Sequence, residues 1–502
     1  MDRLNRKRSA YQDRPVKVIQ FGEGNFLRAF ADYMIDCANE QNIFNGNIVL
    51  IKPMPQNTAS DICNLFRKQE CQYTVVLRGQ IDGQISSTKR IISCVKEMIS
   101  VHDAYAEVLA LAGLDTLELV ISNTTEAGIT YDAADHRTEE EPPETYPGKL
   151  TAFLYERFRI FAGDPTKALY ILPTELIDDN AAKLKQCVLR YASDWKLGAE
   201  FSKWVAESCT FCNTLVDRIV SGYPREEAEQ MQQEMGYEDA LLDVAEPFGL
   251  WVIEEQKEIR KIFPLDLAGM PILFAESIVP YKKRKVRILN GAHTSFALAS
   301  FLTGNDDVYT SMQDACVRNY IRKTLYREVI PELALPEGEA EEFAAAVLER
   351  FSNPFIRHRL LSIALNSVSK WRERCMPSLI AYEQNRKQLP SHLVFSLAAL
   401  LQFYSGTEYE NGIFAGSRKA DGNLNGAEQK YQICDDRAVL EFFSQNGKYT
   451  TAEFTEAALG QTAFWGIDLN KIPGLTRAVT VYLGDIRYNG MRKAMERLDG
   501  KE

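Results

Sequence analysis

The sequence lacks the features of membrane and exported proteins. Its longest apolar stretch, residues 393–404, contains Ser396 and Gln402 and falls well short of the roughly 20 residues that a membrane helix needs. The N-terminal segment MDRLNRKRSAYQDRP is basic, but the strand-like KVIQF follows it instead of the apolar segment of an export signal. We therefore expect a cytoplasmic protein that does not bind membranes, with a buried core helix at residues 393–404.

Cysteine and positive charge are also scarce. Ten cysteines in 502 residues show no repeating frame, which argues against a disulfide-stapled domain and favours reduced thiols. The 69 acidic residues outnumber the 58 basic ones, so the net charge is −11 with the five histidines neutral. We therefore expect no nucleic-acid partner and no broad anionic-membrane surface, whereas a local basic pocket for a small anion is compatible with this charge.

What is present is an ordinary globular composition, with 45% apolar and 25% charged residues over a length that suits two or three domains. The first half alternates β-branched runs with helical patterns, which is typical of a parallel sheet covered by helices. The predicted strands are residues 16–21, 47–52, 73–77, 117–122 and 168–172. From about residue 285, apolar residues recur at three- and four-residue spacing. The sequence predicts an α/β fold, with a Rossmann-like doubly wound domain at residues 1–278 and a mostly α-helical domain at residues 279–502.

The strongest local motif is VIQFGEGNFLRAF, an apolar strand that ends at Phe21 and leads through Gly22 and Gly24 into a helix. Glycines at both positions let the backbone turn tightly and approach a pyrophosphate, and the helix N-terminus offers N–H groups to the anion. Leu27 replaces the third glycine of the common fingerprint, and Arg28 either supplies positive charge or braces the helix. The motif favours a bound dinucleotide, and an ordinary strand–turn–helix is the alternative.

The second predicted strand does not fix which dinucleotide binds. An acidic residue at its end would hold the adenosine ribose of NAD, but residues 47–52 end in Lys52, which Pro53 follows. NAD is therefore the expected cofactor without NADP being excluded.

A second candidate site lies near the boundary of the two predicted domains. On an ideal helix Asn290 and His293 share a face, and Lys285 lies within about 140° of both. A lysine desolvated beside Arg284 and Arg287 would have a lowered pKa and would suit a general base. Asn290 could donate to a developing alkoxide and His293 could orient a substrate hydroxyl. The alternative is a solvated basic helix start.

Other motifs carry less weight. Cys209 and Cys212 form a CxxC, but no second pair follows at ligand spacing, so a metal or redox site is not expected. Tyr281 and Lys285 have the spacing of short-chain dehydrogenases, but the glycine turn lacks the pattern of that class. A hydrolase is poorly supported because no G-x-S-x-G elbow is present.

The glycine turn combined with Lys285, Asn290 and His293 resembles the polyol-specific long-chain dehydrogenase family, the mannitol dehydrogenase-like enzymes. The resemblance covers most of the chain. Its further segments are SNTTEAGI at 122–129, PTELIDDN at 173–180, NTLVDRIV at 213–220, EPFGLWVIE at 246–254 and RFSNPFIRHRLLSIAL at 350–365.

Within that family, the sequence is most similar to the branch of hexuronate catabolism that interconverts altronate and tagaturonate with a nicotinamide cofactor and no zinc. The resemblance implies that Lys285 is the general acid/base, that Asn290 belongs to the oxyanion pocket and that His293 orients the substrate. It also places Asp217 near the catalytic lysine and, more weakly, Asn180 in the substrate site. The implied cofactor residues are Gly22, Glu23, Gly24, Asn25, Phe26, Arg28, Asn123 and Thr124.

The segment RFSNPFIRHR suggests how a substrate carboxylate is held. Where mannitol enzymes have an acid, this chain has His358 between Arg357 and Arg359, which makes the wall more positive. Drift on a surface helix is the alternative. On a helix the two arginines point apart, so we expect Arg357 and His358 to bind substrate and at most one of the arginines to matter.

Two other functions stay open. The first keeps the family but changes the substrate to mannonate and fructuronate or to an uncharged polyol such as mannitol. The second is a nucleotide-binding sensor without catalysis, against which the intact set of Lys285, Asn290 and His293 argues. The sequence does not predict the oligomeric state.

Overall fold

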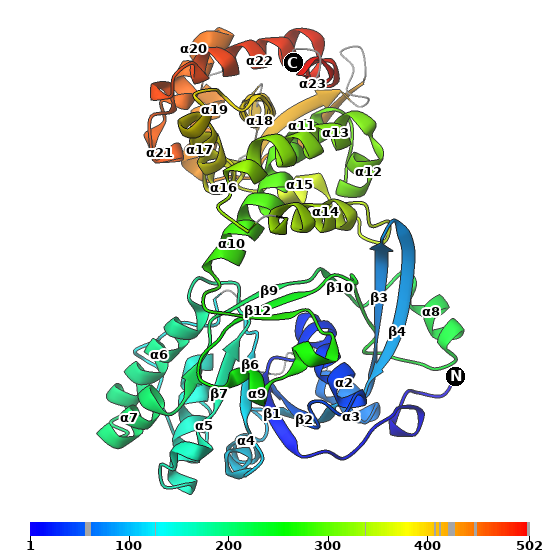
Figure 1. Ribbon diagram of the computed structural model, residues 1–502, viewed down its shortest axis with the longest axis vertical. Coiled ribbons are helices and arrows are strands. Elements are labelled where there is room, and N and C mark those ends of the chain that lie inside the picture. Colours follow the sequence, from blue (N-terminus) through cyan, green and yellow to red (C-terminus); the bar gives the residue numbers. More distant parts are fainter. Residues whose placement is uncertain are drawn as a thin grey trace. The chain divides into compact units, whose positions relative to one another are not determined.

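The computed structural model describes residues 1–55, 62–125, 127–336, 338–405, 408–410, 413–419, 427–445 and 449–498. Glu126, in the family-like segment 122–129, lies outside these residues. The chain divides into two compact units, Met1–Tyr281 and Lys282–Glu502, and each is described by itself (Figure 1). In these described ranges, we find no helix that combines the length and the apolar character needed to cross a membrane.

A six-stranded parallel sheet forms the centre of the first unit. Its strands lie in the order β5-β2-β1-β6-β7-β8, so the chain steps outward in one direction from β1 and then in the other. The strands are β1 (Val16–Phe21), β2 (Asn47–Lys52), β5 (Val95–Ser100), β6 (Leu119–Ser122), β7 (Tyr170–Pro173) and β8 (Thr210–Phe211). This is the doubly wound order of a Rossmann domain, which confirms the predicted fold class.

Both faces of this sheet are buried, which explains the nearly continuous apolar runs of its strands. Val18 of β1 packs into one apolar cluster, whereas Ile19 and Phe21 pack into another on the opposite face. In Figure 1, α5, α6 and α7 lie on one side of the sheet and α2 and α3 on the other. These helices are α2 (Tyr33–Glu40), α3 (Ile62–Lys68), α5 (Tyr146–Ile160), α6 (Asn180–Asp194) and α7 (Ala199–Glu207).

Two smaller sheets complete the first unit. The predicted strand at residues 73–77 belongs to β3 (Tyr73–Ile81), but it pairs antiparallel with β4 (Gln84–Ile92) and lies outside the six-stranded sheet. The remaining strands of these two sheets are β10 (Val220–Gly222) and β11 (Asp243–Ala245) in one, and β9 (Thr214–Asp217), β12 (Leu250–Glu254) and β13 (Ile272–Ala275) in the other. Alternation of apolar residues finds a strand but not its partner, and here the partner decides the sheet.

The second unit is largely helical, as predicted. Its centre is formed by α11 (Gly291–Leu302) and α18 (Ser391–Phe403), whose side chains are apolar and buried nearly all round. The predicted core helix at residues 393–404 is therefore confirmed. The surrounding helices include α12 (Val308–Gln313), α13 (Ala315–Lys323), α14 (Glu339–Phe351), α16 (Ser367–Arg374), α22 (Leu475–Asn489) and α23 (Met491–Leu498). A small antiparallel sheet of β14 (Glu408–Glu410), β15 (Ile413–Lys419) and β16 (Glu428–Gln432) is added.

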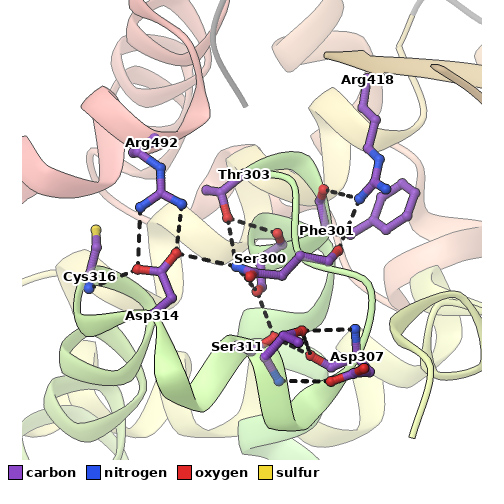
Figure 2. A network of polar contacts seen from close by, with 11 residues as sticks. Ser300, Phe301, Thr303, Asp307, Ser311, Asp314, Cys316, Arg418 and Arg492 are labelled. Atoms are coloured by element: carbon purple, nitrogen blue, oxygen red, sulfur yellow. Dashed lines mark hydrogen bonds and ion pairs between the residues drawn. The ribbon is translucent and has the colours of Figure 1, made fainter. Parts of the chain in front are cut away.

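Polar contacts fix the C-terminal end of α11 (Figure 2). Arg418 of β15 donates to the backbone oxygens of Phe301 at 2.8 Å and Asn305 at 2.9 Å. Arg492 of α23 forms an ion pair with Asp314, the N-cap of α13, at 2.6 Å. Segments from the end of the chain thus hold the helix whose first turn carries His293.

Candidate functional site

The turn after β1 requires glycine at its first position. Gly22 has a φ of 118°, a backbone conformation that side chains disfavour. A Cβ atom on Gly22 would lie 2.7 Å from the backbone oxygen of Asn123. Because Asn123 directly follows β6, Gly22 lets the carboxyl ends of β1 and β6 approach each other.

Glycine at the second position of the turn, Gly24, has a different role. Gly24 has an ordinary φ of −64°, and a Cβ atom on it would meet no described atom within 4 Å. It caps a helical run that starts at Asn25 and continues through a π turn at Arg28–Asp32 into α2. The first N–H groups of such a run have no acceptor inside the helix. Gly24 therefore keeps the surface beside these N–H groups open to an approaching anion.

A cavity of about 480 Å³ lies at the carboxyl ends of these strands. Its wall includes five residues of the predicted cofactor site: Gly22, Glu23, Gly24, Asn123 and Thr124. Pro53 and Met54 after β2, and Tyr146 and Lys149 of α5, also line it. The strand order reverses between β1 and β6, and ligands of doubly wound sheets bind at this reversal.

A buried carboxylate that the sequence did not single out organises the loop after β6. Glu175 accepts hydrogen bonds from the backbone N–H and the hydroxyl of Thr124 at 3.0 and 2.9 Å, and from the Ser122 hydroxyl at 3.1 Å. Burial raises the pKa of Glu175, and these hydrogen bonds partly oppose the rise. The only signal in the sequence was an acidic residue two positions after a buried strand.

Arg28 braces the helix start, the second of its two predicted roles. The residue is 3% exposed, and its guanidinium donates to the Leu241 backbone oxygen at 2.5 Å and to the side-chain oxygen of Asn25. Asp243 forms an ion pair with it at 3.8 Å. Phe26 stacks on Phe30, at 4.9 Å between ring centroids. Arg28, Asn25 and Phe26 thus support the turn, and they are not among the residues that line the cavity.

In the second unit, a π turn aligns Lys285 and Asn290, two candidate residues that are five positions apart. The helix α10 (Val279–Lys285) passes into α11 through a π segment at Val286–Asn290, where the Gly291 N–H donates to the Val286 oxygen. Such a turn is wider than an α-turn, so each residue rotates less about the helix axis. Lys285 and Asn290 therefore lie on nearly the same side, closer than the 140° expected for an α-helix. Three residues further, His293 follows on that side.

His293 is the one residue of α11 that is not fully buried. Its ring stacks on Phe351 with centroids 4.2 Å apart, and the ring of His358 meets it edge-on at 5.4 Å. Burial lowers the pKa of His293 well below its usual range, and the nearby His358 and Arg350 lower it further. The imidazole is therefore neutral near pH 7 and can donate one hydrogen bond and accept another.

A cluster of cations surrounds His293, and the sequence analysis did not identify it. Lys370 and Arg374 lie four residues apart on one face of α16, and both, with Arg350 of α14, lower the pKa of His293 electrostatically. The Lys370 ammonium donates to the Ile363 oxygen at 3.0 Å, and Arg374 donates to the Thr294 hydroxyl at 3.4 Å. Burial and the neighbouring Arg374 lower the pKa of Lys370.

The segment around His358 is not helical, so the helical spacing assumed for Arg357 and Arg359 does not apply. Arg359 pairs as an isolated bridge with Asp307, and the Val308 N–H donates to the His358 oxygen at 3.0 Å. Arg357 is 57% exposed at its side chain and pairs with Asp307 at 3.5 Å.

Arg284 and Arg287, the expected neighbours of the lysine, are turned to other helices. Arg284 forms an ion pair with Glu339 of α14 at 3.6 Å. Arg287 donates to the Glu373 oxygen at 2.6 Å, at the end of α16. They join the segment around the π turn to the helices that carry the cation cluster.

The side chain of Asn180, which is expected in the substrate site, is held by backbone groups of the first unit. Its side chain is 0% exposed and donates to the backbone oxygens of Pro173 and Thr214 at 3.0 and 3.2 Å. The Asn180 side-chain oxygen accepts from the Thr214 N–H at 3.1 Å. The side-chain hydrogen bonds of Asn180 thus join β7, α6 and β9. Asp217, also expected near substrate, is buried at the end of β9 opposite Leu250.

The cysteines of the CxxC motif are buried in the first unit. Burial raises the pKa of both Cys209 and Cys212 to about 12, so they are thiols rather than thiolates near pH 7. Within the described ranges, no three residues of the His, Cys, Asp and Glu types are grouped as metal ligands.

Two matched domains cover most of this sequence. Residues 16–266 match the mannitol dehydrogenase Rossmann domain, and residues 277–486 match the mannitol dehydrogenase C-terminal domain. Altronate oxidoreductase of Yersinia enterocolitica is 43% identical over 502 residues, which cover 99% of each chain. Altronate oxidoreductase of Escherichia coli is 41% identical over 505 residues, covering 99% of this chain and all of the relative.

Solved structures share the fold at lower identity. A ternary complex of Pseudomonas fluorescens mannitol 2-dehydrogenase with NAD and D-mannitol is 22% identical, with a TM-score of 0.68 over the whole of both chains. A substrate-free D-sorbitol dehydrogenase is 21% identical, with a TM-score of 0.79 over 98% of this chain and all of the other. At these identities the likeness concerns the fold alone.

Proposed function

Because the chain belongs to the mannitol dehydrogenase family, we propose that it is a nicotinamide-dependent oxidoreductase that interconverts D-altronate and D-tagaturonate. Relatives named altronate oxidoreductase, identical at 41–43% over essentially the whole chain, support this substrate. The observation that carries the proposal is the group of three cations around His293, because altronate has a carboxylate and a hexitol such as mannitol has none.

The first unit is proposed to hold the dinucleotide, with NAD as the expected form. The open surface at Gly24 and the free N–H groups of the helix start fit a pyrophosphate. Glu23, Asn123 and Thr124 line the same cavity and would contact the rest of the cofactor. When bound, the nicotinamide supplies the acceptor of a hydride in oxidation and its donor in reduction.

The second unit is proposed to supply the proton chemistry. During oxidation the C–H bond breaks as a hydride and the O–H proton passes to the Lys285 amine, so that a carbonyl forms. Asn290, on the same side of the helix, would donate a hydrogen bond to the oxygen as negative charge develops on it. The neutral His293 would orient the reacting hydroxyl without adding a charge beside the lysine.

The substrate carboxylate is proposed to bind at Lys370 and Arg374, with Arg350 contributing charge. A carboxylate that accepts charge-assisted hydrogen bonds from such groups gains about 1.5–3 kcal/mol over an uncharged analogue. His358 remains a proposed substrate residue because its ring faces His293, whereas Arg357 is directed to Asp307.

A substrate panel tests the proposal. Altronate, mannonate and mannitol are each offered with NAD and with NADP, and formation of the reduced nicotinamide is followed by its absorbance. We expect altronate with NAD to give the highest kcat/KM, above mannitol by about 10- to 150-fold. A preference for mannonate would change the substrate and keep the carboxylate site, whereas an equal or higher rate with mannitol would overturn the proposed substrate class.

A further inference from the structure

Lys149 is a buried lysine in the wall of the proposed cofactor cavity that the proposed reaction does not use. It lies in the first turn of α5, and its side chain is 3% exposed. Its ammonium has three N–H donors. Within the described ranges it makes one hydrogen bond, to the Glu144 backbone oxygen at 2.6 Å. The ammonium therefore has hydrogen-bonding capacity left for a ligand.

The charge of Lys149 is not neutralised by a direct ion pair among the described residues. The nearest acids that affect it are Glu144 and Asp135. The Asp135 carboxylate already accepts from the N–H groups of Glu144 and Thr145 at 2.8 and 2.9 Å, where it fixes the start of α5. Buried charges in proteins are ordinarily paired, so a cation held in this way favours an external anion.

His102 and Lys52 add no negative charge to the neighbourhood of Lys149. His102 contacts the Pro53 oxygen at 3.2 Å, and burial together with Lys149 lowers its pKa, which leaves the ring neutral near pH 7. Lys52, also buried, donates to the Met54 oxygen at 3.0 Å. An acid at the end of β2 would hold a ribose, whereas these residues favour a phosphate.

We propose that the Lys149 ammonium binds a phosphate group of the dinucleotide. This inference rests on the proposed function, because the ligand is its cofactor. The shared chemistry is a charge-assisted hydrogen bond from an ammonium to a phosphate oxygen. Two phosphates can supply it: the pyrophosphate, which NADH and NADPH both carry, or the 2′-phosphate, which NADPH alone carries.

The experiment measures dissociation constants of NADH and NADPH for the full-length protein by fluorescence titration. The variants are Lys149→Met, Lys149→Arg and, as a matched control, Lys183→Met, which removes a charge from an exposed position on α6. We expect Lys149→Met to raise the dissociation constant by about 10- to 150-fold, Lys149→Arg to restore most of the affinity, and Lys183→Met to change nothing. Equal losses for both nucleotides indicate the pyrophosphate, and a loss for NADPH alone indicates the 2′-phosphate.

The pH dependence of the unmodified protein gives an independent measurement. Burial lowers the pKa of Lys149 to about 8, so its charge is present below that pH and is lost above it. The charged and titratable groups that act on the ammonium are Glu144 and Asp135, together with His102, whose lowered pKa keeps its ring neutral throughout this range. NADH affinity should therefore fall as the pH rises through about 8 in the wild type and should lose this slope in Lys149→Met. Thermal unfolding of each variant separates this effect from loss of structure.

The possible failures are distinguishable. If the wild type binds neither NADH nor NADPH, the proposed function is wrong and the inference fails with it. If the wild type binds and Lys149→Met binds as tightly, with the same pH slope, the inference alone is overturned. A Lys149→Met variant that unfolds at lower temperature but keeps the affinity assigns Lys149 a structural role and also overturns the inference.

Discussion

The two units present their candidate sites in different ways. In the first, one contiguous turn from Phe21 to Asn25 provides both glycines and the helix start, and the cavity lies beside it. In the second, the residues around His293 of α11 come from two other helices, α14 and α16, and from the segment of His358. A site made by one turn can be identified in a sequence, whereas a site assembled from distant segments depends on how they pack. The predictions below test this difference.

The largest expected effect is that on turnover when Lys285, on the helix that continues through the π turn into α11, is replaced. Lys285→Met removes the group proposed to carry the proton, so turnover should fall by about 10²–10⁴-fold. NADH affinity should stay near the wild-type value, because the proposed dinucleotide residues belong to the first unit. Steady-state rates with altronate and NADH titration check the two statements. A variant that keeps more than about a tenth of the wild-type rate would remove the lysine from its assigned role.

The next effect is on the residues brought together from distant segments. Lys370→Met with Arg374→Met should lower the ratio of kcat/KM for altronate over mannitol by about 10- to 150-fold, because the carboxylate loses its charged donors. Arg357→Ala is the control: its charge pairs with Asp307, and the ratio should stay unchanged. If Arg357→Ala alone reduces the ratio, the substrate carboxylate binds at residues 357–359, as the sequence suggested.

The residues in these two predictions show which features could be predicted from the sequence and which could not. The doubly wound sheet, the helical second half and the glycine turn could be predicted because periodicity and turn chemistry are local. The π turn between Lys285 and Asn290 could not, because the ideal helix used for the angle has no extra residue per turn. His358 was identified, but its segment is extended because backbone pairing with residues 307 and 308 replaces the helix.

Two residues show why the remaining parts of the site could not be predicted. Glu175 organises the loop after β6 only because β6 and β7 are neighbours in the sheet. Lys370 is separated from His293 by 77 positions, and nothing in the spacing indicates that α16 packs beside α11. The sequence also contains no sign of the hydrogen bonds by which the Asn180 side chain joins three elements of the first unit. Contact between distant segments decides each of these cases.

A smaller effect separates the two glycines of the turn. Gly24→Ala should raise the dissociation constant of NADH about tenfold, equal to about 1.4 kcal/mol, while the melting temperature stays unchanged, because the added methyl group meets no atom of the described residues within 4 Å. Gly22→Ala should lower both the affinity for NADH and the melting temperature, since a positive φ costs about 1–2 kcal/mol and the methyl group would clash with Asn123. Titration and thermal unfolding of both variants check this. If Gly24→Ala lowers stability as much as Gly22→Ala, the two glycines have the same structural role.

The smallest expected effect concerns a motif that is contiguous but is not proposed as a site. Cys209 and Cys212 have the spacing of a metal or redox pair, yet burial raises the pKa of both thiols to about 12. A protonated, buried thiol is inert toward an alkylating reagent, and among the described residues no group of three potential ligands is present for a metal. Dialysis against a strong chelator, and treatment of the folded protein with iodoacetamide at pH 7, should therefore leave the rate of altronate oxidation unchanged. If chelation removes activity and zinc restores it, the lysine mechanism is wrong and the CxxC becomes the first candidate for the metal. In that case the CxxC spacing alone would have identified the site. We expect instead that a contiguous motif functions only where the fold leaves it accessible to a ligand, as it does at Gly24.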